Sequence, residues 1–236
     1  MMKLRAFFFF LAGLLAMVSG PALADPLTSD QQKAVETVIH DYLLAHPEIV
    51  EEALKAAGER RAAHAMNELM ADKSAPGDGN PKGDVTIVEF FDYNCPYCKL
   101  VAPTLATLLK EDPKLHIVYR EFPILGKSSV LAAHAALAAQ EQGKYLELHN
   151  ALIALKGKLD DEQVLATASK AGVDVARLAQ DMTKDDIDAL LQKNFDFADT
   201  LGIRATPTFI IGGKLVPSAL SLESLRKLIA EARAHG

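Results

Sequence analysis

Residues 85–99 read VTIVEFFDYNCPYCK and carry the strongest structural pattern of the chain. Its first part is apolar apart from Thr86 and Glu89, which predicts a largely buried central strand. Apolar residues then recur at helical spacing from Leu100 to Leu108, and residues 116–119 (HIVY) predict a second strand. A strand, a helix and a strand of these lengths indicate a βαβ unit, so we expect an α/β protein.

The rest of the chain predicts a helical block, a hairpin and a closing helix. Residues 128–201 show apolar groups at helical spacing, interrupted by glycines. The expected helices of this block are 132–139, 145–155, 162–171 and 186–201. Residues 208–216 predict a hairpin with its turn at Gly212 and Gly213, and residues 222–232 predict the last helix.

A helical arm is expected ahead of this domain. Residues 29–70 are nearly free of glycine, and an apolar stripe runs from Val35 to Leu43. Pro47 is placed to begin a second helix, where its missing amide hydrogen costs least. Residues 71–84 (ADKSAPGDGNPKGD) predict a linker. The stripe must be buried against its own domain or against another copy of the chain, and both alternatives stay open here.

The first residues predict an export signal. The chain opens MMKLR, continues with an apolar run to Val18, and has small residues at Ala22 and Ala24. We expect cleavage after Ala24 and a mature protein in the periplasm. A membrane-anchoring helix is the alternative, but the run is shorter than the roughly 18 to 20 residues of a span. The expected divisions are signal 1–24, arm 25–70, linker 71–84 and domain 85–236 with an insertion at about 128–201.

The composition narrows the class of protein further. The 236 residues are 50% hydrophobic and 24% charged, with a formal net charge of −6. This is too apolar for a disordered chain and too charged for a multi-span membrane protein. A net negative chain without a basic stripe is not expected to bind nucleic acid.

The only two cysteines, Cys95 and Cys98, lie between the predicted strand and helix. A structural disulfide closing so short a loop would stabilise the fold by only about 2 kcal/mol. A closed zinc site needs four ligands, and the chain has no second cysteine pair and no histidine pair one helical turn apart. No metal site is expected, although transient copper binding by the two thiols stays open.

Thiol–disulfide exchange suits the position of the pair better. Cys95 precedes the helix, where free amide groups and the helix dipole stabilise a thiolate. Cys98 lies one turn further on, where it can attack Cys95 and resolve a mixed disulfide. We therefore expect Cys95 to be exposed and acidic, and Cys98 to be buried.

Residues 90–99 (FFDYNCPYCK) and 205–209 (ATPTF) resemble the two active-site segments of DsbA-family thioredoxin-fold proteins. The resemblance implies a thioredoxin-like fold with a helical insertion, here preceded by the N-terminal helical arm. It also implies a cis peptide bond before Pro207 and a substrate strand pairing with the backbone of Thr206. The substrate-binding residues are then Pro96, Tyr97, Thr206 and Pro207.

Glu89 lies where this family carries a buried acid that helps to move the proton of the resolving cysteine. Strand alternation places it on the same face as Phe91, near the cysteines. An apolar strand is expected to raise the pKa of its carboxyl group, which suits proton transfer. An exposed glutamate at a sheet edge is the alternative.

Details within the family indicate a disulfide isomerase or reductase. Tyr97 and Thr206 resemble the isomerase branch, DsbC and DsbG, and residues 42–48 (YLLAHPE) resemble suppressor of copper sensitivity C proteins. The resemblance implies protein substrates, a membrane redox partner, assembly of subunits through the arm, and no organic cofactor. A DsbA-like oxidase and a copper-sequestering thiol protein are the alternatives.

Overall fold

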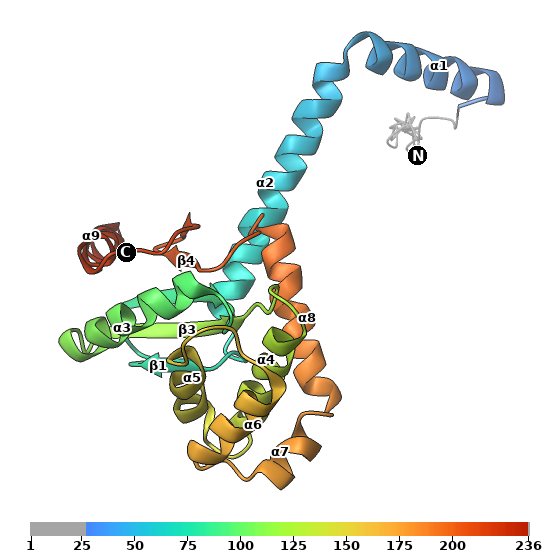
Figure 1. The fold of residues 1–236 in the computed structure, drawn as a ribbon. Coiled ribbons are helices and arrows are strands. Elements are labelled where there is room, and N and C mark those ends of the chain that lie inside the picture. Colours follow the sequence, from blue (N-terminus) through green and yellow to red (C-terminus); the bar gives the residue numbers. More distant parts are fainter. Residues whose placement is uncertain (1–26, 236) are drawn as a thin grey trace, which may run out of the picture. The chain divides into compact units, whose positions relative to one another are not determined.

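The computed structural model describes residues 27–235 (Figure 1). Contacts within the chain divide it into two units, residues 1–55 and 56–236. The predicted export signal and its cleavage point after Ala24 lie outside the described residues. Among the helices that the structure describes, none is both long and apolar enough to cross a membrane.

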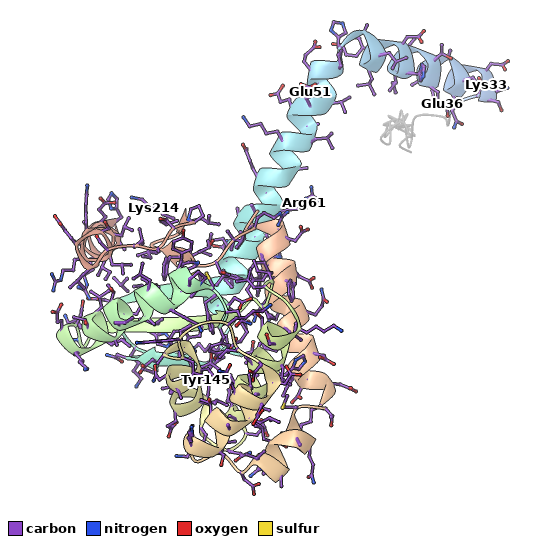
Figure 2. The ribbon with its side chains drawn as sticks, in the orientation of Figure 1. Lys33, Glu36, Glu51, Arg61, Tyr145 and Lys214 are labelled. Atoms are coloured by element: carbon purple, nitrogen blue, oxygen red, sulfur yellow. The ribbon has the colours of Figure 1, made fainter. Side chains whose placement is uncertain are left out.

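The first unit contains α1 (Ser29–Ala45) and the first turns of α2 (Pro47–Ala71). The Thr28 side chain accepts a hydrogen bond from the Gln31 amide, and the Gln31 side chain accepts one from the Thr28 amide. This capping box stabilises the first turn of α1. No residue of α1 is buried, and charged side chains such as Lys33 and Glu36 extend away from it (Figure 2).

The second unit is built on a five-stranded sheet covered by helices on both faces. After α2 its elements are β1 (Gly77–Gly79), β2 (Val85–Phe91), α3 (Pro96–Glu111), β3 (Leu115–Glu121), α4 (Lys127–Gln140), α5 (Tyr145–Ile153), α6 (Asp161–Lys170), α7 (Val175–Asp181), α8 (Asp185–Thr200), β4 (Thr208–Ile211), β5 (Lys214–Val216) and α9 (Leu222–His235). The predicted order of strand, helix, strand, helical insertion, hairpin and helix is confirmed.

The strand order is β1-β3-β2-β4-β5, which places β2 at the centre. β2 pairs in parallel with β3 and antiparallel with β4, so the βαβ unit is confirmed. In this register Glu89 lies between Tyr119 of β3 and Phe209 of β4. Every residue of β2 except Thr86 is buried, as expected for a central strand.

Side chains alternate along β2 between two layers of helices. Ile87 and Phe91 pack with the layer that contains α3, α9 and much of the insertion. Val88 and Phe90 pack with the end of α2 and with α8. Since successive side chains of a strand point to opposite faces, Glu89 shares the face of Ile87 and Phe91 and therefore that of α3.

Residues 71–84 contain a strand where a linker was expected, because β1 pairs antiparallel with β3. A Cβ atom at Gly77 would lie 2.6 Å from Nε2 of His116, and one at Gly79 would lie 2.5 Å from the carbonyl oxygen of Leu115. Gly79 also has a φ of +83°, which disfavours other residues. The glycines that indicated a linker are needed because β1 lies close against β3.

The helical insertion differs from expectation by one short helix. α4, α5, α6 and α8 overlap the predicted segments, whereas α7 was not predicted. α7 has 7 residues and buries only Leu178 and Asp181, which is too little for a periodic apolar pattern. Asp174 begins this helix by accepting a hydrogen bond from the Arg177 amide.

Candidate active site

Cys95 directly precedes α3, and its thiol is buried. Pro96 follows at the start of the helix, and the Cys95 amide donates to the Asp92 carbonyl oxygen at 3.0 Å. Cys95 is 3% exposed, so the expectation of an exposed Cys95 is wrong. Its Sγ donates to the carbonyl oxygen of Thr206 at 3.1 Å. Thr206 belongs to the loop before β4, far along the chain, and this loop covers the thiol.

The Cys95 thiol is acidic, as expected. A hydrogen bond with Cys98 lowers its pKa most, and burial opposes this effect. Hydrogen bonds from Thr206 and from the backbone amides of Cys98 and Tyr97 lower the pKa further, to about 5. These amides belong to the first turn of α3, where backbone donors lack partners within the helix.

Cys98 has the opposite character. Burial raises the pKa of its thiol, and the hydrogen bond with Cys95 and the nearby Glu89 carboxyl raise it further. Cys98 is 1% exposed, and both cysteines are free thiols. The pair therefore combines one thiol that ionises easily with one that keeps its proton, and such a pair is suited to disulfide exchange.

The loop before β4 forms one wall of a groove beside the cysteines. The Thr206–Pro207 peptide bond is cis, as the resemblance implies. The groove has a volume of about 470 Å³ and is lined by Tyr97, Leu100, Ala205, Thr206, Pro207, Pro217, Ser218 and Ala219. Three of the predicted substrate-binding residues thus line one groove, whereas Pro96 is exposed at the start of α3 and does not line it.

Glu89 is buried, not exposed at an edge, and lies near Cys98. Both residues line a cavity of about 30 Å³ between the sheet and α3, together with Asp78 and Tyr119. Burial raises the pKa of Glu89 to about 8, and the charge of Cys95 adds to this effect. A carboxyl group with this pKa can accept or release a proton near neutral pH, which is the chemistry expected of it.

A buried polar cluster next to this cavity was missed in the sequence. Oε1 of Glu121 accepts hydrogen bonds from the hydroxyls of Tyr93 at 3.0 Å and Tyr145 at 2.9 Å. The Tyr93 hydroxyl also lies 3.1 Å from Nδ1 of His149, which lines the cavity. Burial raises the pKa of Glu121 and lowers that of His149 to about 3. The available signal was a glutamate that directly follows the predicted strand and Arg120.

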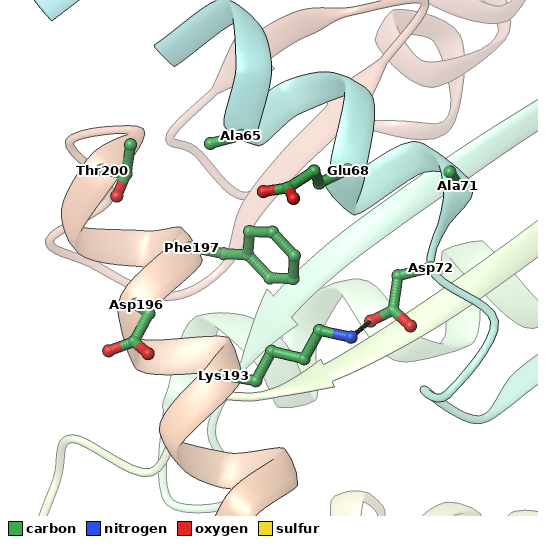
Figure 3. Close-up of a pocket in the computed structure, with 8 residues that line it drawn as sticks. All are labelled: Ala65, Glu68, Ala71, Asp72, Lys193, Asp196, Phe197 and Thr200. Carbon is green, nitrogen blue, oxygen red and sulfur yellow. Dashed lines mark ion pairs between the residues drawn. The ribbon is translucent and has the colours of Figure 1, made fainter. Parts of the chain in front are cut away.

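A separate pocket of about 490 Å³ lies between the end of α2 and α8 (Figure 3). Nζ of Lys193 lies 2.9 Å from Oδ2 of Asp72, and the same oxygen lies 2.8 Å from Nη1 of Arg120. Burial alone would raise the pKa of Asp72, but the hydrogen bonds from Arg120 and Lys193 lower it. None of the predicted site residues lines this pocket.

Metal-binding side chains do not gather in the described part of the chain. Within residues 27–235 no group of three or more His, Cys, Asp or Glu side chains is placed to hold a metal ion.

A buried dithiol at a helix start, beside a cis proline on an α/β sheet, defines a thioredoxin-fold protein. The sequence model of the DSBA-like thioredoxin domain matches residues 86–230, and the chain belongs to this family. The thioredoxin-like fold with its helical insertion is thereby confirmed. The model of the copper resistance protein ScsC N-terminal domain matches residues 31–63, within the helical arm.

Similar proteins of known structure include a thioredoxin-like oxidoreductase from Silicibacter pomeroyi DSS-3. It is 42% identical, with a TM-score of 0.69, over 71% of this chain and 97% of that one. A mutant of Proteus mirabilis ScsC with a deletion in its linker is 29% identical, with a TM-score of 0.69, over 89% of this chain and 98% of that one. The chain is also 28% identical to a Na(+)/H(+) antiporter NhaA 1 of Salinispora arenicola, over 76% of this chain but only 29% of the antiporter.

Proposed function

We propose that the protein is an exported thiol–disulfide oxidoreductase that acts on the disulfides of other proteins. The observation that carries this proposal is the acidic Cys95 thiol, paired with a protonated Cys98 thiol beside the groove at Thr206 and Pro207. Membership of the DSBA-like family and the likeness to a thioredoxin-like oxidoreductase support it. The reaction needs no organic cofactor.

The two thiols act in sequence. The Cys95 thiolate attacks one sulfur of a substrate disulfide, forming a mixed disulfide and releasing the other substrate sulfur as a thiolate. Cys98 then attacks Sγ of Cys95 and releases the second substrate sulfur, while the proton of Cys98 passes to the ionised form of Glu89. The substrate gains two electrons, and Cys95 and Cys98 become a disulfide. In isomerisation a substrate thiolate attacks the mixed disulfide instead, and Cys95 is released reduced.

The groove beside Cys95 holds the substrate in this proposal. An extended substrate segment pairs with the backbone of Thr206, and Pro207, Pro96 and Tyr97 form the surface that it contacts. Tyr97 and Leu100 both line the groove and are 61% and 69% exposed, and an apolar surface formed by several side chains commonly marks a contact site.

We infer that the activity is that of an isomerase or a reductase. Tyr97 and Thr206 resemble the isomerase branch, and the match of residues 31–63 to the ScsC N-terminal domain supports this choice. Such an enzyme needs a membrane partner that keeps Cys95 reduced, whereas an oxidase needs one that reoxidises it.

Refolding of a protein with scrambled disulfides tests the proposed activity. The reduced chain should restore the native disulfides without added oxidant, and the Cys95→Ser variant should not. If only the oxidised chain acts, and only on a reduced substrate, the protein is an oxidase. If the wild-type chain fails in both assays, the proposed function is wrong.

A copper-sequestering protein is the second candidate. The match of residues 31–63 to a domain named for copper resistance favours it, as do two neighbouring free thiols. Tight copper binding by the reduced chain, lost in the Cys95→Ser variant, together with no disulfide turnover would establish this function instead.

We further propose that the arm joins copies of the chain and that the protein works in the periplasm. Apolar side chains of the stripe from Val35 to Leu43 are exposed, including Val35 at 45%, Val38 at 68% and Ile39 at 53%. Exposed apolar stripes of this kind favour association. Export rests on the predicted signal and its cleavage after Ala24, which the mass of the mature protein tests.

A further inference from the structure

The residue before Cys95 is bonded to the helical insertion at two separate places. Nδ2 of Asn94 lies 3.0 Å from Oγ of Ser128 and 2.9 Å from Oγ of Ser129, both at the start of α4. Oδ1 of Asn94 accepts a hydrogen bond from the amide of Leu159 at 2.6 Å, just before α6. The Asn94 side chain thus holds together segments 34 to 65 residues further along the chain.

The residue after Cys98 is bonded to the same part of the insertion. Nζ of Lys99 donates to the carbonyl oxygens of Leu155 at 2.7 Å and Gly157 at 2.6 Å. Residues 155–159, which connect α5 to α6, are therefore bonded to the chain on both sides of the Cys95–Cys98 segment. We call residues 155–159 the brace.

The side chain of Asp92 also fixes the turn that leads into Cys95. Oδ1 of Asp92 accepts a hydrogen bond from the Asn94 amide at 2.7 Å, and Oδ2 accepts one from the Leu125 amide at 2.9 Å. Asp92 is 1% exposed, so these bonds are shielded from water. Because Asp92 and the brace both form hydrogen bonds with Asn94, its backbone has little freedom to move.

Fixing this turn matters because the Cys95 thiolate depends on several short contacts. They come from the Cys98 thiol, from Thr206 and from the first amides of α3. A backbone shift at Asn94 would lengthen all of them together, since hydrogen bonds weaken steeply with distance and angle. Hydrogen bonds to charged groups are also the stronger ones, so their loss is costly.

We propose that Asn94 and Lys99 are positioning residues, through which the helical insertion holds Cys95 in its reactive orientation. This rests on the proposed function, since it concerns the thiol that attacks. The insertion then does more than cover the sheet: the brace is a structural part of the active site.

The test measures the rate at which iodoacetamide alkylates the reduced full-length chain as a function of pH. Cys98 is buried with a raised pKa, so the midpoint reports on Cys95. Asn94→Ala should move the midpoint upward by about one unit, which is the change expected if the freed backbone costs the Cys95 thiolate one of its own hydrogen bonds. Lys99→Met should move it in the same direction by less. Cys98 on α3 and Glu89 on β2, which interact with the Cys95 thiol, are unchanged in both variants, and Asn94→Ala changes no charge at all.

Asp160→Ala is the matched control, because it removes the side chain that begins α6 beside the brace without touching Asn94. It should lower the melting temperature and leave the midpoint in place. If Asn94→Ala lowers the melting temperature but leaves the midpoint at the wild-type value, the proposal is overturned. If Asn94→Ala does not fold, the Ser128→Ala, Ser129→Ala double variant replaces it, because it keeps Asn94 and removes two of its partners. Its midpoint should also move upward, and an unchanged midpoint would overturn the proposal. A wild-type midpoint near the ordinary thiol value of about 8.5 would instead contradict the proposed function.

Discussion

Single residues set the chemistry of the site, above all the difference between Cys95 and Cys98. A pKa of about 5 makes the Cys95 thiolate the main form at neutral pH, whereas an ordinary protein thiol is mostly protonated there. Burial raises the pKa of the Cys98 thiol, so Cys98 is protonated at neutral pH. In the proposed exchange this difference gives the two steps an order, with Cys95 first.

Glu89 gives a prediction about stability and pH. Its pKa is about 8 in the folded protein against 4.5 for the free group, so the folded state keeps a proton that the unfolded chain loses. The stabilising contribution is fully present below about pH 4.5 and is lost as the pH rises through 8. The Glu89→Gln variant cannot ionise, so it should lose less stability than the wild type between about pH 5 and pH 8.

Urea unfolding of the disulfide form at these two pH values measures the part of this difference that burial of Glu89 causes, because the cysteines carry no titrating thiol in that form. Glu36→Gln, on the exposed α1, is the control and should behave like the wild type. Equal losses of stability in the wild type and in Glu89→Gln would show that Glu89 ionises normally.

At the scale of elements, the parts read correctly from the sequence are those with a long local pattern. α3 carries an apolar period over its 16 residues, and β2 and β3 each contain a run of apolar strand-forming residues. β1 was missed because it is rich in glycine and is held by backbone pairing, which leaves no side-chain pattern. α7 was missed because a helix of two turns is too short to show an apolar period. Longer-range features had no local signal: the burial of Cys95 under Thr206 depends on a segment 111 residues away.

Arg120 links two elements and gives a prediction about stability. It is fully buried on β3, where Nη1 lies 2.8 Å from Oδ2 of Asp72 and Nη2 donates to the carbonyl oxygen of Leu69 in α2 at 3.3 Å. Arg120→Ala empties a fully buried site and leaves Asp72 with only the partly exposed Lys193 as a charged partner, so it should lower the free energy of unfolding by about 3–5 kcal/mol.

Lys193 supplies the matched comparison, because it pairs with the same Asp72 from a side chain that is 46% exposed. Lys193→Ala should cost no more than about 1 kcal/mol. Chemical denaturation of both variants measures the two losses in the free energy of unfolding. Similar losses would mean that the buried pair of Arg120 and Asp72 does not hold the end of α2 in place.

At the scale of the whole molecule, the arm predicts assembly. Val38 and Tyr42 are 68% and 54% exposed and lie one helical turn apart on α1. Light scattering should give the wild type a mass greater than that of one chain. The Val38→Asp, Tyr42→Asp double variant should fall to the mass of one chain, because two charges would have to be buried.

Lys33→Asp changes the opposite face of α1 and is the control, which should keep the wild-type mass. If light scattering gives the wild-type protein the mass of one chain, the proposed assembly through the arm is wrong. The arm would then need another partner for its apolar side chains.

The most direct test of the central claim is the mass of a trapped mixed disulfide. The Cys98→Ser variant, incubated with a peptide disulfide, should gain the mass of one peptide strand at Cys95, and a reductant should remove it, because the resolving thiol is absent. The Cys95→Ser variant should gain nothing, since the remaining thiol is buried and protonated. A stable adduct on Cys98, or none on either variant, would contradict the account of an attacking Cys95 and a resolving Cys98.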